Sequence, residues 1–471
     1  KDRRLDLGLT LVLLALVIAS RLAAFPVSIW EQDEAVFSAA VIDFEPTDNR
    51  PHPPWFPLWI GMGKLVHMVG LEPAAALQVI SLVFSIWIVF PLTALWSPVV
   101  GRRLATASAV LFLVAPGPWF FSGRAFSGTA ATALLTAALA CWIQAADRPR
   151  WLTAGSILGV LAVLVRPHYA PAIIGAALMI GFRVPARSRL RLLATLTIGL
   201  CLGAIALVIA GGGVAPMWSA MEIHADYHFS RLDQAERGLA GSGFSRSLGH
   251  PALVVAWLVL FHIGMIGVYG RGRWKDITPI LFGALLPLMV VIYGLSNPAH
   301  ARYALPVLAL TCGLVAIGLE RIFRKWWWVA VAGSAAVAVG LIGPQLTAYR
   351  STLSPPVAAL ETAIDQAWDV QGTLVVDRSL HAFVVARELR QPIDVPVVFD
   401  HLIERGFATP PDASGTVFLF DAGHDDILIE TESRMIFTTE IPLVRTLSQD
   451  RFLDLTVATG ARLEEASLVE P

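Results

Sequence analysis

The sequence is poor in charge and, within that charge, poor in lysine. Only 15% of its 471 residues are charged, and just four of the 35 basic residues are lysine. A typical soluble domain carries about 25% charged residues, and a soluble chain of this length would fold as two or more domains with polar surfaces. The chain has too few charged residues to cover such surfaces. Its formal net charge of −1 gives no reason to expect a nucleic-acid partner.

Cysteine is scarce as well. The three cysteines, Cys141, Cys201 and Cys312, lie far apart inside apolar runs. An odd number of cysteines in such places excludes a disulfide framework. The spacing of the three cysteines also matches no zinc site.

Apolar runs fill the first three quarters of the chain, which is 56% hydrophobic overall. A transmembrane helix needs about 20 predominantly apolar residues, and this length predicts a polytopic α-helical membrane protein. The eleven expected spans are roughly Leu5–Phe25, Ala74–Trp96, Leu104–Phe121, Ser127–Ala146, Trp151–Val165, His168–Phe182, Leu192–Gly212, Pro251–Gly270, Ile277–Leu295, Tyr303–Leu319 and Trp326–Gly343. The first run resembles a signal peptide in its basic start, but its length and the ten further spans favour an uncleaved anchor.

The positions of Lys and Arg predict the orientation, because cytoplasmic loops of membrane proteins are rich in basic residues. Basic clusters occupy alternate short loops: Lys1/Arg3/Arg4, Arg102/Arg103, Arg148/Arg150, Arg183/Arg187/Arg189/Arg191, Arg271/Arg273/Lys275 and Arg321/Arg324/Lys325. We therefore expect the N-terminus in the cytoplasm, long outer loops at about 26–73 and 213–250, and the C-terminal tail outside.

The tail has a different composition, which divides the chain into a membrane domain at 1–344 and a second domain at 345–471. From residue 345 it holds 20 Asp and Glu against nine Arg. Strand-like runs at Thr373–Asp377, Val395–Asp400 and Thr416–Asp421 alternate with helical patterns such as Ser379–Arg390, and this alternation predicts a small α/β domain. Strand-end aspartates can bind ligands, but they are more often helix caps or turn formers, and we assign them structural roles.

The first outer loop carries two adjacent acids, Asp33 and Glu34, before a run that predicts a helix lying on the membrane. A second interfacial helix is expected at 54–70, with Trp55 and Trp59 as anchors at the level of the lipid headgroups. The two acids fit a helix start, but a carboxylate at a membrane–water boundary can also take a proton from an incoming hydroxyl.

Other polar residues accumulate on the same face. Arg124, Arg166 and Arg302 follow or precede apolar spans there, and converging arginines suit a phosphate or pyrophosphate group. The alternative is that they reach toward lipid headgroups. The second loop contains Glu222, His224, Asp226 and His228, which either hold a divalent metal ion or form a solvated polar loop, so a metal cofactor stays open.

Taken together, these motifs resemble the GT-C superfamily of glycosyltransferases, and within it the bacterial branch of protein mannosyltransferases and aminoarabinose transferases. The resemblance covers about residues 1–345 and rests on five short motifs in order: Asp33-Glu34, His52-Pro53-Pro54, Gly70-Leu71-Glu72, Arg166-Pro167 and Arg302-Tyr303-Ala-Leu-Pro306. The chain departs from the branch after Arg124, where Ser127-Gly128-Thr129 stands in place of an acidic residue, and its tail matches no family.

The resemblance implies a multi-span fold in the bacterial cytoplasmic membrane, with two interfacial helices cradling a lipid-linked donor. It implies inverting transfer of a sugar from a polyprenyl phosphate to a hydroxyl of a lipid, glycan or protein acceptor outside the membrane. The implied roles are a general base for Asp33, with Glu34 as the second candidate, and binding of the donor phosphate by Arg302 and Arg166. Tyr303, His52 and His168 are expected to add hydrogen bonds to the substrate.

The main alternative is a lipid or solute transporter or flippase. Transporters place ionisable residues and broken helices near the middle of the bilayer, whereas the expected spans here carry almost no charge; Arg21, at the end of the first, is the exception. A scaffold whose outer tail binds a partner is a further alternative.

Overall fold

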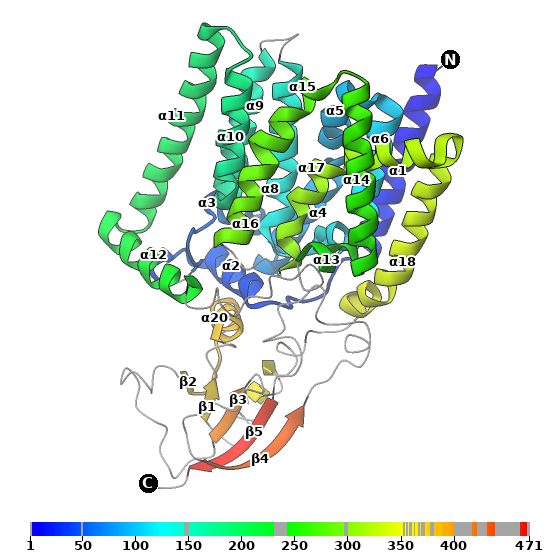
Figure 1. Cartoon of the computed structure of the whole chain (residues 1–471). Coiled ribbons are helices and arrows are strands. Elements are labelled where there is room, and N and C mark those ends of the chain that lie inside the picture. The colour runs from blue at the N-terminus through cyan, green and yellow to red at the C-terminus, as the bar shows by residue number, and fades with distance from the viewer. Residues whose placement is uncertain are drawn as a thin grey trace.

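The computed structural model describes residues 2–48, 50–145, 150–229, 243–295 and 300–351, parts of 354–376, residues 381–399, and three strands at 417–421, 431–438 and 462–468. A bundle of helices forms one end of the molecule, and a small sheet forms the other (Figure 1). The N-terminus lies at the far end of the bundle from the sheet.

The expected apolar runs all fall on helices. The long helices of the bundle are α1 (Asp2–Ala23), α4 (Pro73–Trp87), α5 (Val89–Val100), α6 (Arg102–Val114), α8 (Ser127–Gln144), α9 (Arg150–Val165), α10 (Ala170–Gly181), α11 (Ala186–Ala210), α14 (Pro251–Gly270), α16 (Leu286–Leu295), α17 (Ala304–Phe323) and α18 (Trp327–Ser351). Among the described residues, five helices are long and apolar enough to cross a membrane, or six if one bent pair is a single span. The structure thus confirms a mostly helical chain with several potential spans, while the count of eleven stays a prediction.

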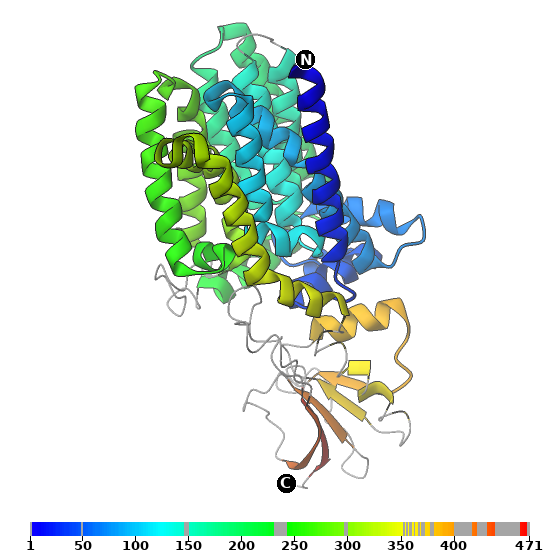
Figure 2. The same ribbon diagram turned by 90° about the vertical axis from the view of Figure 1, so that its right-hand side faces the viewer.

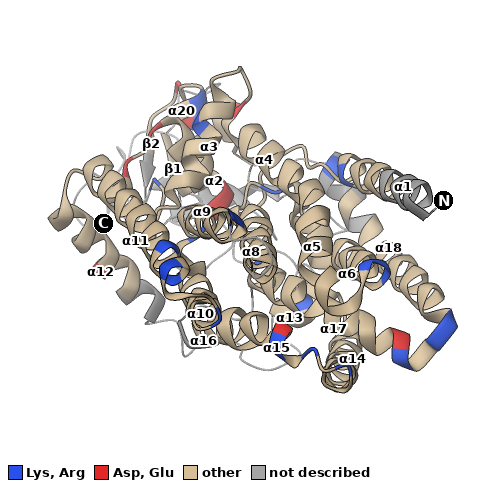
Figure 3. Ribbon diagram, turned by 90° about the horizontal axis from the view of Figure 1, so that it is seen from above, with Lys and Arg blue, Asp and Glu red and all other residues tan. Residues whose placement is uncertain are grey.

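Shorter helices connect or cover the long ones. They are α2 (Gln32–Ile42), α3 (Pro57–His67), α7 (Pro116–Phe120), α12 (Val214–Phe229), α13 (Gly243–Leu248) and α15 (Trp274–Thr278), the π-helix η5 (Pro279–Leu285), and the 3₁₀ turns η1 (Pro46–Asp48), η2 (Phe121–Gly123), η3 (Pro167–Tyr169), η6 (Ala301–Tyr303) and η7 (Arg324–Trp326). Seen from the N-terminal end, most of the ribbon carries no charge, and Lys and Arg lie near helix ends such as the start of α11 (Figure 3).

The centre of the bundle is formed by α8 and α17. Every residue of α8 from Ser127 to Trp142 is buried, as is every residue of α17 from Ala304 to Leu319. Both helices are rich in Ala, Gly and Thr, which let backbones approach closely in a membrane protein. Because these two helices are surrounded by the others, their first residues have fixed positions at the end of the bundle that faces the sheet.

The helices break sharply at two places, one inside a predicted span and one between two predicted spans. The run expected at 104–121 is bent by 68° between α6 and the segment that begins at Pro116, because the residue before a proline avoids the helical conformation. The junction expected at Arg166-Pro167 is the 3₁₀ turn η3 between α9 and α10. Both breaks lie where the chain leaves the bundle and reaches the polar loops.

The first outer loop folds into α2 and α3, as expected, but its tryptophans do not face the lipid. Trp55 is 5% exposed and Trp59 is fully buried in the protein core, so the prediction that they anchor the chain at the headgroups is wrong. Nor does α2 lie open on the membrane, because its residues Phe37, Ala40 and Val41 pack into the bundle.

Beyond α18, which continues to Ser351, the chain forms a five-stranded mixed sheet. Its strands are β1 (Thr373–Val376), β2 (Val397–Phe399), β3 (Val417–Asp421), β4 (Thr431–Thr438) and β5 (Arg462–Leu468), in the order β2-β1-β3-β5-β4. β1 pairs in parallel with β2 and β3, while β5 runs antiparallel to β3 and β4. The sequence patterns did not predict β4 and β5. Of the strand-end aspartates, Asp377 and Asp400 lie outside the described residues, and Asp421 ends β3.

The helix α20 (His381–Arg390) joins the two ends of the molecule. It lies beneath α2 in both side views (Figures 1 and 2), and Ala35 of α2 shares a small apolar core with Phe383 and Val384 of α20. The helix that carries the paired acids therefore lies between the bundle and the C-terminal segment.

Candidate active site

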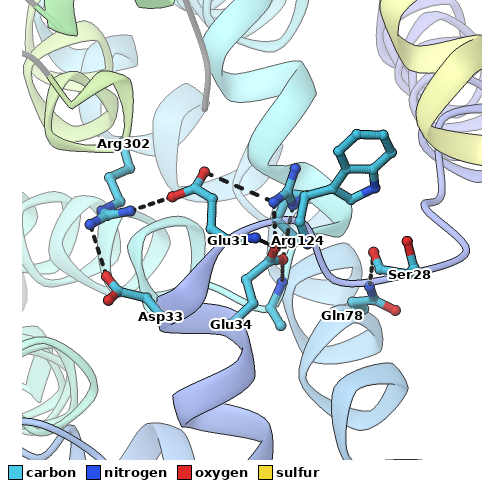
Figure 4. Close-up of polar contacts among 9 residues, drawn as sticks. Ser28, Glu31, Asp33, Glu34, Gln78, Arg124 and Arg302 are labelled. Carbon is cyan, nitrogen blue, oxygen red and sulfur yellow. Dashed lines mark hydrogen bonds and ion pairs between the residues drawn. The ribbon is translucent and has the colours of Figure 1, made fainter. Parts of the chain in front are cut away.

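Four chain segments meet where the bundle faces the sheet. They are the first turn of α2, the start of α8, the turn after α9 and the turn before α17. Three carboxylates and two arginines from these segments form a continuous network (Figure 4). All of these segments are fixed by buried helices, so the network is rigidly supported.

Glu34 is the most enclosed member of the network. Its side chain is fully buried, and its Oε1 accepts hydrogen bonds from Nε of Arg124 and the backbone N–H of Ala125, both at 2.9 Å. Its Oε2 accepts from the backbone N–H groups of Trp30 and Glu31 at 2.8 and 3.1 Å, and Nη2 of Arg124 also donates to it. Five donors saturate this carboxylate, which leaves no lone pair for a substrate.

Arg124 is accordingly buried in the protein and does not reach for headgroups. Only 1% of it is exposed, and its guanidinium lies 4.9 Å from the ring centre of Phe120. Its Nη2 also lies 3.9 Å from Oε1 of Glu31. The alternative that Arg124 reaches toward the lipid surface is therefore wrong.

Arg302 bridges the other two carboxylates. Its Nη1 donates to Oε2 of Glu31 at 2.7 Å, and its Nη2 donates to Oδ2 of Asp33 at 2.8 Å. The ring of Phe126 lies against the guanidinium at 4.9 Å. The two NH₂ groups of a planar guanidinium each contact one carboxylate here, whereas a lysine ammonium would have to hold both from a single nitrogen.

Asp33 is the accessible carboxylate of the network. About 30% of its side chain is exposed, against 3% for Glu31 and none for Glu34. Burial raises the pKa of Asp33, but the positive charge of Arg302, followed by His52, His300 and Arg166, outweighs this and lowers the pKa to about 2. The carboxylate is therefore ionised at neutral pH, and its ion pair is lost only as the pH falls from about 4 toward 2.

Arg166 lies beside this network without an acidic partner among the described residues. It is 3% exposed, its Nη1 donates to Oγ of Ser127 at 3.0 Å, and its guanidinium lies 5.1 Å from the ring centre of Tyr303. The start of α8 packs closely here: a Cβ at Gly128 would lie 3.3 Å from Leu305 and 3.9 Å from Nη1 of Arg166. Among the described residues Arg166 thus forms no ion pair with a carboxylate, although its charge contributes to the low pKa of Asp33.

Aromatic and imidazole rings surround the charged groups. His52 lies between Phe37 and His224, with ring centres at 5.5 and 5.4 Å. His168 and His300 lie 6.4 and 5.7 Å from Tyr303. The predicted residues Asp33, Arg302, Arg166, Tyr303, His52 and His168 are thus brought together at one end of the bundle.

Two long helices also begin at this site. α8 starts at Ser127 and α17 at Ala304, so the positive ends of both helix dipoles point toward it. Helix N-termini favour phosphate groups. With Arg166, they make this end of the bundle attractive to a phosphate.

The structure gives no support to a metal site in the second loop. No group of three or more His, Cys, Asp or Glu side chains suited to a metal occurs in the part of the chain that is described. Glu222 accepts a hydrogen bond from Nε1 of Trp218 at 2.7 Å, while His224 stacks on His52. The side chains of Asp226 and His228 lie outside the described residues.

Sequence patterns missed Glu31, Phe126 and the stacking of His224 on His52. Glu31 stands two residues before Asp33 and Phe126 two after Arg124, and this proximity was the signal available for them. No local pattern indicates that the second loop packs against the first, because the two are far apart in the sequence.

No family model and no curated protein sequence matches the chain. Solved structures do match. ArnT from Cupriavidus metallidurans bound to undecaprenyl phosphate matches with a TM-score of 0.59 at 10% identity, and the match covers 98% of each chain. The apo form of ArnT matches with a TM-score of 0.55 at 11% identity, and this match covers both chains fully. An oligosaccharyltransferase from Archaeoglobus fulgidus tethered to an acceptor peptide has 0.51 at 12% identity. The chain has the GT-C fold.

The two matches differ in extent. The likeness to ArnT includes the C-terminal segment, because it covers nearly all of both chains. The likeness to the oligosaccharyltransferase covers 82% of this chain and 64% of the archaeal one. The GT-C fold that sequence motifs indicated is thereby confirmed, at identities that show the fold alone.

Proposed function

We propose that the protein is a membrane glycosyltransferase that moves a sugar from a polyprenyl-phosphate donor to an acceptor hydroxyl. The observation that carries this proposal is the meeting of Asp33, Arg166 and Arg302 in one partly exposed site of a GT-C fold. A carboxylate that can accept a proton thus lies beside two arginines that can neutralise a departing phosphate.

The chemistry requires one base and stabilisation of one leaving group. The acceptor oxygen attacks the anomeric carbon from the face opposite the phosphate, and its proton passes to Asp33. As the new glycosidic bond forms, the bond between the anomeric carbon and the phosphate oxygen breaks, with inversion. The released polyprenyl phosphate carries the electron pair and needs no added proton when arginine and helix dipoles stabilise its charge.

The roles of the other residues follow from their contacts. Arg166 has no acidic partner among the described residues and is placed to bind the phosphate, together with Arg302. Tyr303, His52 and His168 line the same site and supply hydrogen bonds to the donor or acceptor. Glu34 is proposed to position Arg124 and the first turn of α2, because its five bonds leave it no free acceptor.

The donor class is supported by the ArnT structure, which holds undecaprenyl phosphate on the same fold. The acceptor is proposed as a hydroxyl of a lipid, glycan or protein. The protein is proposed to lie in the bacterial cytoplasmic membrane with its C-terminal segment outside, which follows from the basic clusters of the alternate loops.

The position of the charges weighs against a transporter. The network lies at one end of the bundle, where α8 and α17 begin, and not midway along the helices. Arg21, the charged residue expected inside a span, donates to the backbone carbonyl of Leu113 and lies over the ring of Trp119. It therefore has a local structural partner.

The experiment that tests the proposal uses Asp33→Asn. We expect release of undecaprenyl phosphate from undecaprenyl-phosphate monosaccharides, measured in membranes that supply the acceptor, to fall by about 10²–10⁴ because the base is lost. The variant should unfold at the same temperature as the wild type. Glu320→Gln, which removes a carboxylate from Arg271 at the other end of the bundle, should leave turnover unchanged. Wild-type turnover in Asp33→Asn would exclude Asp33 as the base.

A further inference from the structure

In the donor-free site the proposed base, Asp33, is bound to Arg302, which is one of the residues proposed to bind the phosphate. Both ends of the Arg302 fork are occupied by carboxylates, Nη1 by Glu31 and Nη2 by Asp33. Nη2 has a second N–H group, so a phosphate can approach it, but the phosphate then competes with Asp33 for the positive charge of the same guanidinium. In the same state Asp33 is a poor base, because a carboxylate with a pKa of about 2 takes a proton far less readily than one poised near neutral pH.

The two carboxylates on Arg302 differ in how easily they can leave. Glu31 is 3% exposed and belongs to the capping box of α2, in which it and Glu34 each accept a bond from the other's backbone. Asp33 is about 30% exposed. A ligand that binds Arg302 therefore displaces Asp33 more easily than Glu31. Glu31 meanwhile holds the guanidinium in place through its bond to Nη1.

The incoming phosphate interacts with Arg302 more strongly than Asp33 does. It carries more negative charge than one carboxylate, and its oxygens match the arginine fork. The phosphate also meets Arg166, which forms no ion pair with a described carboxylate, and the positive ends of α8 and α17. Asp33 is also attracted to Arg166, but a single carboxylate brings less negative charge to this site than a phosphate does.

We infer that the donor phosphate displaces Asp33 from Arg302, so that donor binding itself releases the base that the acceptor needs. This inference rests on the proposed function and adds an order to it: the donor binds first, and only then does Asp33 take the acceptor proton. No acceptor hydroxyl is activated in the absence of a donor, which protects the site from unproductive proton transfer.

The test measures binding of undecaprenyl phosphate, without any sugar, to the purified full-length protein in detergent. Asp33→Asn removes the competitor for Nη2, so we expect affinity to rise about fivefold, the size expected for a partly exposed ion pair. In the Arg302→Ala background the same substitution should give no gain. Glu320→Gln should leave the affinity as in the wild type.

The Arg302→Ala background separates displacement from simple repulsion between Asp33 and the phosphate. A gain that persists without Arg302 would attribute the effect to repulsion and overturn the inference, as would unchanged or weaker binding in Asp33→Asn. A wild-type readout covers the case in which the variants do not fold: undecaprenyl phosphate should inhibit competitively against the donor, and non-competitive inhibition would overturn the order. If the wild type neither binds undecaprenyl phosphate nor transfers sugar, the proposed function itself fails.

Discussion

Two neighbouring acids, Asp33 and Glu34, have opposite surroundings although the sequence presents them as a pair. Glu34 points into the protein, where it is surrounded by Arg124, the backbone N–H of Ala125 and the two backbone N–H groups just before α2. Asp33 points outward to Arg302. Successive side chains of a helix lie about 100° apart, so one residue of offset separates a structural carboxylate from an accessible one.

Because the two acids have different surroundings, substitution of Glu34 should lower the stability of the protein, whereas substitution of Asp33 should not. Glu34→Gln leaves Arg124 buried without its counter-charge, which typically costs about 3–5 kcal/mol, so the midpoint of thermal unfolding in detergent should fall markedly. Asp33→Asn should unfold at the wild-type temperature. In the double variant Glu34→Gln/Arg124→Gln part of the loss should return, since both charges of this buried pair are removed together. Equal stability of Glu34→Gln and the wild type would show that the pair is not structural.

At the scale of elements, α14 and α17 are held in direct backbone contact by two glycines. A Cβ at Gly264 would lie 2.0 Å from the carbonyl oxygen of Leu314, and one at Gly318 would lie 2.2 Å from that of Leu260. The contact is reciprocal, with one glycine on each helix facing the backbone of the other. Because α17 begins at Ala304, two residues after Arg302, this contact also fixes the position of that arginine.

We expect Gly264→Ala to force the two helices apart and to lower the free energy of unfolding by about 1–3 kcal/mol. Thermal unfolding in detergent measures this, and turnover should fall with it because Arg302 shifts. Gly333→Ala is the matched control: it lies in α18 with open space around the added methyl, and alanine is favoured over glycine in a helix by about 1 kcal/mol. Equal effects of the two substitutions would contradict close packing of α14 on α17.

At the scale of the whole molecule, the C-terminal segment supports the helix that carries Asp33. The backbone N–H of Ser354 donates to Oγ of Ser28 at 2.9 Å just before α2, and Phe383 of α20 packs on the face of α2 that bears Ala35. The tail therefore contributes to the site by holding α2 from the side opposite the bundle.

Removal of this support should affect catalysis more than donor binding. In Phe383→Ala we expect turnover to fall several-fold, while the affinity for undecaprenyl phosphate changes little, because Arg166 and the starts of α8 and α17 belong to the bundle. Deletion of residues beyond 350 should act in the same direction and more strongly. Arg390→Ala, in an exposed pair 4.0 Å from Glu72, should change neither quantity. Full turnover after the deletion would show that the tail is dispensable.

Sequence patterns predicted the helical membrane class and the position of each apolar run because these depend on local composition. They also identified Asp33, Arg166 and Arg302, whose motifs stand at helix ends. They did not predict that Arg302 is held by Glu31, or that Trp59 is buried, because both depend on contacts between segments that are distant in the chain. The strands β4 and β5 were missed for the same reason: their partners are set by the sheet.

The central place of α17 has a consequence for how the protein is made. The ribosome synthesises α17 after α5, α6, α8 and α14, yet all four of these helices pack against it. Until it arrives, those helices surround an unfilled space, and Arg302 is missing from the site. The bundle therefore cannot complete its packing until α17 has been made. We expect chains truncated before α17 to expose the helix faces that it covers in the full chain, and to be degraded faster than the full chain.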